Sequence, residues 1–155
     1  MERKTKVHAA DGQHDVVITR EFDLPLELLF KAYEDPEIIE QWMGSKVLKQ
    51  ENRKHGGWQL EKKDETGTVV FRANGAFHDF VPGRRIVRTF EMENTPFPAQ
   101  LEFLEFEELP NDRSKLTMQI VYRSVELRDQ MLKMPFEYGV NMAHDLLQKV
   151  LEKLK

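Results

Sequence analysis

Hydrophobic and polar positions alternate with a period of about two through most of the chain between residues 46 and 123, and this alternation predicts β-strands. One more segment of this kind, HDVVITREF at 14–22, precedes them. Turn signals rich in Gly, Pro, Asn and Asp leave only short connections between the later segments, which favours antiparallel pairing. The six later strands are expected at 46–52, 57–64, 68–81, 85–93, 99–109 and 115–123.

Helical spacing replaces this alternation on both sides of the strand-rich region. Apolar residues that follow Asp23 predict a first short helix, and a second one begins at Asp35-Pro36 and ends at Gly44. Proline is not tolerated inside a helix, so Pro135 separates a helical turn at 125–134 from a long C-terminal helix. That helix carries an apolar stripe at steps of three and four: Phe136, Val140, Ala143, Leu147, Val150 and Leu154.

Three positions interrupt these patterns. Gly75 lies inside the longest strand, where glycine indicates a bulge or a bend. The alternation slips by one residue after Phe103, which also suggests a bulge. Gly139 costs the terminal helix about 1 kcal/mol relative to alanine, so we expect it to permit a close approach of helix and sheet.

The order of elements predicts an α+β architecture in a single domain over residues 1–155. One strand, two short helices, six strands and one long helix are typical of a curved antiparallel sheet of six to seven strands wrapped around the C-terminal helix. Such a sheet leaves a cavity between its concave face and the helix, which the helix pair closes at one end. Residues 1–13 carry no such pattern and are expected to be a flexible N-terminal segment.

Composition excludes several classes of function. The net charge of −4 disfavours a nucleic-acid partner, which requires a basic face. The chain has no cysteine, so disulfides and thiolate chemistry are excluded. Its apolar runs are far shorter than the ~20 residues of a membrane helix, and residues 1–15 lack the apolar core of a signal peptide. We therefore expect a cytoplasmic protein without membrane insertion.

Motifs for known chemistry are also missing. No phosphate-binding glycine loop and no Gly-x-Ser-x-Gly elbow occurs in the sequence. Five histidines occur without the spacing of a metal site: His8, His14, His55, His78 and His144. The sequence therefore assigns no catalytic residue, no metal and no cofactor; an enzymatic activity stays open, although the missing motifs weigh against it.

Large apolar side chains come from every element that would surround the predicted cavity. Packing in the core explains many of them, but methionine in particular suits a pocket that accepts variable shapes. The candidate ligand-binding residues are Trp42, Met43, Trp58, Phe71, Phe77, Phe90, Met92, Phe103, Met118, Met134, Phe136 and Met142. Four polar residues on strands are candidates to point inward and orient a ligand: Arg72, His78, Arg88 and Gln119.

Several short motifs, taken in their order and spacing, resemble one known family over residues 14–154. They are TREF at 19–22, DPE at 35–37, QWMG at 41–44, GGW at 56–58, VPGRRIVRTF at 81–90, KLTM at 115–118 and EYGVN at 137–141. The chain resembles the family of activators of heat-shock-protein-90 ATPase homologues, within the START-like, helix-grip superfamily (SRPBCC proteins). The resemblance implies the helix-grip fold; it does not imply a reaction, because this fold carries many functions.

The leading expectation is a cytoplasmic protein that binds a small, largely apolar molecule between the sheet and the C-terminal helix. Three alternatives stay open: a cyclase- or hydrolase-type enzyme, a chaperone-ATPase regulator, and a module that binds another protein. An enzyme needs an inward acid–base pair, and a module without a ligand predicts a fully packed interior. Trp42 and Met43, at the end of the second short helix, are expected to form one wall of the cavity.

Overall fold

The computed structural model describes residues 4–155 and consists of a curved sheet with four helices. The strands are β1 (Lys6–His8), β2 (Asp15–Phe22), β3 (Lys46–Gln50), β4 (Gly57–Lys63), β5 (Val69–Val81), β6 (Arg85–Met92), β7 (Gln100–Leu109) and β8 (Arg113–Val121). The helices are α1 (Leu26–Glu34), α2 (Pro36–Met43), α3 (Val125–Lys133) and α4 (Phe136–Glu152). The two short helices, the separate helix before Pro135 and the long terminal helix therefore lie where the sequence predicts them.

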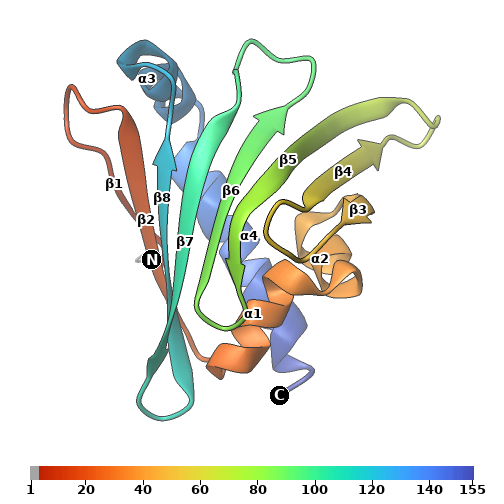
Figure 1. Ribbon diagram of the computed structural model, residues 1–155, viewed down its shortest axis with the longest axis vertical. Coiled ribbons are helices and arrows are strands. Elements are labelled where there is room, and N and C mark those ends of the chain that lie inside the picture. The colour runs from red at the N-terminus through yellow and green to blue at the C-terminus, as the bar shows by residue number, and fades with distance from the viewer. Residues whose placement is uncertain (1–3) are drawn as a thin grey trace.

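All eight strands form one antiparallel sheet in the order β1-β2-β8-β7-β6-β5-β4-β3. The sheet curves around α4, which crosses one of its faces, while α1 and α2 lie near the end of the sheet where the C-terminus emerges (Figure 1). The predicted α+β helix-grip architecture is confirmed. The strand number differs from the expected six or seven, because β1 adds a strand at the edge.

β1 lies in the segment 1–13 that was expected to be flexible. Its residues pair with β2 from Val17 to Thr19, and the preceding Thr5 is fully buried. The Thr5 hydroxyl lies 2.9 Å from Nδ1 of His144 on α4, and this contact fixes the strand to the helix. Residues 1–3 of that segment lie outside the described residues.

The concave face of the sheet, called the inner face below, carries the even-numbered residues of β2, β7 and β8. Ile18, Leu104 and Leu116 are nearly inaccessible to solvent there. The closest backbone neighbours of α4 are α2, α1 and α3, so side chains fill the space between the helix and the inner face. Leu147 and Leu151 of α4 are fully buried in that space, whereas Leu154 lies beyond the end of the helix and is exposed.

The register of β7 differs from the prediction. β7 pairs with both β6 and β8 without any shift, so there is no bulge after Phe103. Continuous alternation places Glu102 and Leu104 on the inner face and Phe103 on the opposite, convex face, where it does not pack against the core. The register shifts of the sheet occur instead in β3, at the end of β4, and in β5 after Phe77.

Two glycines also have roles that differ from those expected. Gly75 is paired directly with Trp58, and a Cβ there would lie 1.9 Å from the carbonyl oxygen of Thr89 and 2.5 Å from the indole Nε1 of Trp58. Gly75 therefore makes room for an indole ring rather than for a bulge. A Cβ at Gly139 would meet nothing within 4 Å, so the expected close approach of helix and sheet does not occur there.

Candidate functional site

An ion pair lies on the inner face among apolar side chains. Arg88 of β6 and Glu102 of β7 are direct partners in the antiparallel register, and Arg88 Nε donates to Glu102 Oε1 at 2.9 Å. Their side chains are only 14% and 4% exposed. The side-chain amide of Gln100 donates to the other carboxylate oxygen, Oε2, at 2.8 Å. Charged groups are rare at such depth, because their burial costs free energy unless they are paired and hydrogen-bonded.

Two aromatic rings hold the Arg88 guanidinium in place. The guanidinium carbon lies 5.1 Å from the ring centroid of Trp58 and 5.9 Å from that of Phe90, within the range of cation–π attraction. Trp58 is itself fixed, because its indole N–H crosses over Gly75 to donate to the backbone carbonyl of Thr89 at 3.2 Å. The position of Arg88 is therefore set by strand register, by its carboxylate partner and by an immobilised indole.

Two buried tyrosines, Tyr33 and Tyr122, lie close enough to the ion pair for the charge of Glu102 to affect their pKa values. Burial raises the pKa of the Tyr33 hydroxyl, and the nearby Glu102 adds to this effect while Arg88 opposes it. Burial also raises the pKa of Tyr122, again with a contribution from Glu102. Both hydroxyls therefore stay protonated and able to donate a hydrogen bond. Within residues 4–155, the buried hydroxyl oxygen of Tyr122 has no hydrogen-bond partner.

A small cavity adjoins Arg88 beneath the helix pair. Its volume is about 10 Å³, close to the space that one water molecule occupies. Trp42 and Met43 form part of its wall, and Trp42 is fixed there by an indole hydrogen bond of 2.7 Å to the carbonyl of Ala32. The lining residues are Ala32, Tyr33, Ile39, Trp42, Met43, Gln50, Trp58, Leu60 and Arg88.

The structure brings some of the residues predicted from the sequence to this site and places others elsewhere. Trp42, Met43, Trp58 and Arg88 line the cavity, and Phe90 packs on Trp58 with 5.2 Å between ring centroids. Five more predicted residues belong to the core or pack against it: Phe71, Phe77, Met92, Met118 and Phe136. Three do not contribute to the site: Phe103 on the convex face, and Met134 and Met142, which are 50% and 52% exposed.

Of the four polar candidates, only Arg88 lies at the site. Arg72 forms an ion pair with Glu61 across the strand pair β4–β5, and Gln119 donates to Asp15 at 2.8 Å. His78 is exposed. Neither Arg72 nor Gln119 shares a face with Arg88. Each stands directly next to an inner-facing residue of its own strand, and neighbouring residues of a strand point to opposite faces.

Sequence reasoning missed Glu102, Gln100, Tyr33 and Tyr122. The slip assumed after Phe103 assigned the inner face of β7 to the wrong parity, and this concealed Glu102. The sequence nevertheless carried a signal. Phe106 and Leu104 are apolar residues two positions apart, and the same step of two towards Gln100 places Glu102 on the same face. A carboxylate at an apolar position, opposite an arginine on the neighbouring strand, indicates an inward ion pair.

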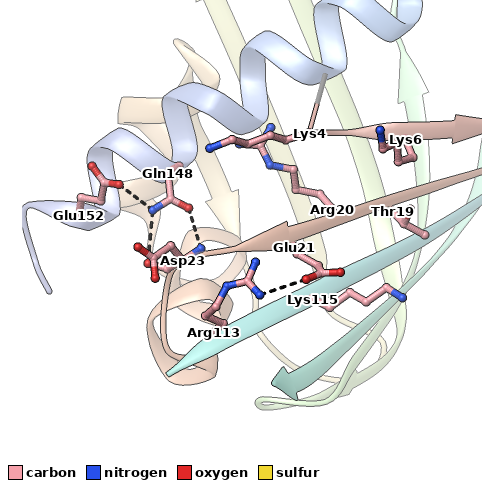
Figure 2. Close-up of a pocket in the computed structure, with 10 residues that line it drawn as sticks. All are labelled: Lys4, Lys6, Thr19, Arg20, Glu21, Asp23, Arg113, Lys115, Gln148 and Glu152. Atoms are coloured by element: carbon pink, nitrogen blue, oxygen red, sulfur yellow. Dashed lines mark hydrogen bonds and ion pairs between the residues drawn. The ribbon is translucent and has the colours of Figure 1, made fainter. Parts of the chain in front are cut away.

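A larger hollow of about 620 Å³ lies at the β1–β2 edge of the sheet, beside the C-terminal half of α4 (Figure 2). Several of its charged groups are paired: Arg113 with Glu21 at 3.2 Å, and Asp23 with Lys155, outside the hollow, at 3.4 Å. Gln148 further bridges Asp23 and Glu152 through hydrogen bonds (Figure 2). This surface lacks the enclosed apolar wall that binds a small molecule, so the inner face is the better candidate.

Two other kinds of site are absent from the part of the chain that the structure describes. Residues 4–155 contain no group of three His, Asp or Glu side chains arranged to hold a metal ion. No helix within the same range has both the length and the apolar character needed to cross a bilayer.

Comparisons with known proteins place this geometry in context. A sequence model of the family described as "Activator of Hsp90 ATPase homolog 1-like protein" matches residues 23–152. No curated protein sequence matches the chain.

Similar solved structures share the fold at low sequence identity. A crystal structure of a Rhodobacter sphaeroides protein has a TM-score of 0.84 at 17% identity and covers 96% of this chain and 99% of its own. A Mycobacterium smegmatis protein has a TM-score of 0.82 at 20% identity, covering 94% and 95%. An Arthrobacter aurescens protein solved by NMR has a TM-score of 0.83 at 19% identity, covering 96% and 91%.

Proposed function

The chain belongs to the Activator of Hsp90 ATPase homolog 1-like family, and from this premise we propose that it binds a small, largely apolar molecule in the cytoplasm, between the inner face of the sheet and α4. The observation that carries the proposal is Arg88, which lines a small cavity among mostly apolar and aromatic residues and is paired with the buried Glu102. A few fixed polar groups within an apolar enclosure are typical of small-molecule sites.

The unpartnered Tyr122 hydroxyl supports the same proposal. A buried polar atom without a hydrogen bond costs about 1–3 kcal/mol, and such atoms in native proteins call for a reason. A ligand atom that accepts or donates at this hydroxyl supplies one.

Ligand entry requires the inner face to open, because the cavity of about 10 Å³ holds no more than about one water. The backbone of α4 does not lie close to the strands, and side chains fill the space between them. Several inner-face residues are only half-buried, among them Phe90 and Met92. Methionine side chains repack at little cost, so the part of the wall next to Met43 and Met92 is the part best able to widen.

A thermal-shift screen against a library of apolar compounds tests the proposal. A compound that binds only the folded protein stabilises it by ~2.7 kcal/mol at a hundred times its dissociation constant. For a chain of this length, the melting temperature then rises by about 6–10 °C. Tryptophan emission should change in parallel, because Trp42 and Trp58 both line the cavity.

Two methionines provide a matched pair of variants for the screen. Met43→Lys places a charge in the cavity wall and should abolish the shift, whereas Met142→Lys alters an exposed side chain and should preserve it. Circular dichroism on both variants confirms that they fold. Loss of the shift in Met142→Lys alone would move the binding site to the outside of α4 and contradict the proposal.

A second candidate function is the binding of another protein, for which a chaperone ATPase is the partner that the family suggests. Exposed apolar side chains at intervals of four residues along α4 favour it: Tyr138, Met142 and Leu146. Purified Hsp90 provides the assay. Stimulation of its ATPase rate by the wild-type chain but not by Met142→Lys, together with a silent compound library, would place this function first.

A further inference from the structure

Arg88 carries more hydrogen-bond donors than its protein neighbours accept. Both oxygens of the Glu102 carboxylate already accept bonds, one from Arg88 Nε and one from Gln100. Arg88 uses only Nε for this contact, and neither of its terminal nitrogens, Nη1 and Nη2, has a hydrogen-bond partner among residues 4–155. A guanidinium carries five N–H donors and no acceptor, so the four N–H groups on Nη1 and Nη2 have no partner among the described residues and are open to water or to a ligand.

The two terminal nitrogens of Arg88, Nη1 and Nη2, belong to a side chain that is held in a fixed position. Arg88 lines the cavity, and its guanidinium lies over the Trp58 ring and is hydrogen-bonded to Glu102 through Nε. Tyr33 lines the same cavity, and burial, which raises its pKa, keeps its hydroxyl protonated. A ligand that enters next to Arg88 therefore meets donors at fixed positions, and these suit an acceptor atom on the ligand.

The charge of the site is already balanced. Glu102 compensates Arg88, and Tyr33 is neutral. An anionic ligand group would bring a second negative charge close to Glu102 in a medium of low dielectric constant, where like charges repel strongly. A cationic group would face the same difficulty with Arg88. The balance of charge thus favours an uncharged ligand group.

We propose, building on the proposed function, that the ligand is uncharged and carries a carbonyl-type oxygen, which accepts hydrogen bonds from the terminal nitrogens of Arg88. The apolar body of the ligand packs against Trp42, Ile39 and Leu60, which line the cavity around Arg88. Glu102 acts as a positioning residue: it holds the guanidinium by its Nε edge and neutralises its charge, so that the opposite edge is presented to the ligand.

Three aromatic probes of similar size, each used below its solubility limit, separate the contributions. Acetophenone is uncharged and has a carbonyl acceptor, ethylbenzene has no acceptor, and benzoate has acceptors and a negative charge. Binding is followed through the indole N–H resonances of Trp58 and Trp42 in ¹⁵N–¹H spectra. A hydrogen bond from a charged donor is worth roughly a tenfold gain in affinity, so acetophenone should bind at least about tenfold more tightly than ethylbenzene, with benzoate the weakest.

Arg88→Met should remove the advantage of acetophenone over ethylbenzene. Because this variant leaves Glu102 buried without its partner, the double variant Arg88→Met/Glu102→Leu serves as a second test that removes both charges. Either variant should bind the two uncharged probes within about twofold of each other. Retention of the tenfold preference in the double variant would overturn the assignment to Arg88.

The probe set also separates this inference from the proposed function. Equal binding of acetophenone and ethylbenzene by the wild-type chain overturns the carbonyl inference and leaves apolar ligand binding intact. Tightest binding of benzoate shows that the site binds an anion, and it overturns the inference in the same way. If no probe shifts an indole resonance while another apolar compound from the library does, the inference fails alone; if no compound binds at all, the proposed function fails with it.

Discussion

Arg88 and Glu102 face each other across β6 and β7 and form an ion pair of 2.9 Å on the inner face of the sheet. The desolvation of two charges offsets much of the attraction between them, and apolar side chains of similar volume often replace a buried pair without loss of stability. The pair therefore needs a reason other than stability. We infer that it orients the Arg88 guanidinium towards a ligand.

A double-mutant cycle separates stability from function at this pair. Glu102→Leu should lower the free energy of unfolding by about 3–5 kcal/mol, because it leaves the Arg88 charge buried and unpaired. Arg88→Met/Glu102→Leu should recover most of that loss. Urea denaturation of the two single variants and the double variant provides the free energies. A double variant that loses as much as both single variants together would show that the two residues contribute independently, and it would contradict a coupled ion pair.

Gly75→Ala should destabilise the protein by more than ~2 kcal/mol, because its Cβ would clash with the Thr89 carbonyl and displace the Trp58 indole. Gly139→Ala is the matched control. Its Cβ meets nothing within 4 Å, so alanine should stabilise α4 by up to ~1 kcal/mol. Chemical denaturation of both variants checks the signs. A neutral Gly75→Ala would mean that the indole does not cross β5 as described.

Stability should fall between about pH 6.5 and pH 4 because of His144. Burial lowers the pKa of this histidine to about 4, and the nearby Arg20 lowers it further while Asp145 opposes the shift. The unfolded chain binds a proton near pH 6.5, whereas the folded protein binds it only near pH 4, so acidification favours unfolding. The loss should be on the order of 3 kcal/mol across this range.

His144→Gln provides the control for this pH dependence. The variant should be less stable at neutral pH, because the Thr5 hydroxyl loses its partner at Nδ1, but its stability should vary less between pH 6.5 and pH 4. Parallel denaturation curves for the wild type and the variant test the assignment. Identical pH profiles would show that another group is responsible.

Tyr122→Phe should leave the ligand-free protein as stable as the wild type or stabilise it by about 1 kcal/mol. The substitution removes a buried hydroxyl that has no hydrogen-bond partner among the described residues, so no existing bond is lost. If the hydroxyl contacts the ligand, the same variant should reduce the ligand-induced thermal shift. A clear loss of stability without ligand would indicate that the hydroxyl already has a partner.

Most of the fold could be predicted from the sequence, because the period of the apolar positions determines which elements form. The stripe from Phe136 along the terminal helix and the alternation of 115–123 are strong patterns, and both elements occur where they were expected. β1 escaped prediction because three residues carry too little periodicity. Its position depends on the contact of Thr5 with His144, more than a hundred residues away.

The site was harder to predict than the fold. Arg88, Trp42, Met43 and Trp58 were recognised as candidates, since each is a polar or large apolar residue in an element next to the cavity. Glu102 was missed because one wrong register assignment exchanges the two faces of a strand. Met142 was misplaced for a different reason: helical spacing alone does not show which flank of a terminal helix the sheet covers, and this side chain is 52% exposed.

The most direct test of ligand binding at the inner face is to locate a bound compound by intermolecular nuclear Overhauser effects, using whichever library member raises the melting temperature. We predict cross-peaks from the compound to the ring protons of Trp58 and Tyr33, which line the cavity beside Arg88. Cross-peaks confined to Met142 and Leu146, on the exposed flank of α4, would contradict binding at the inner face.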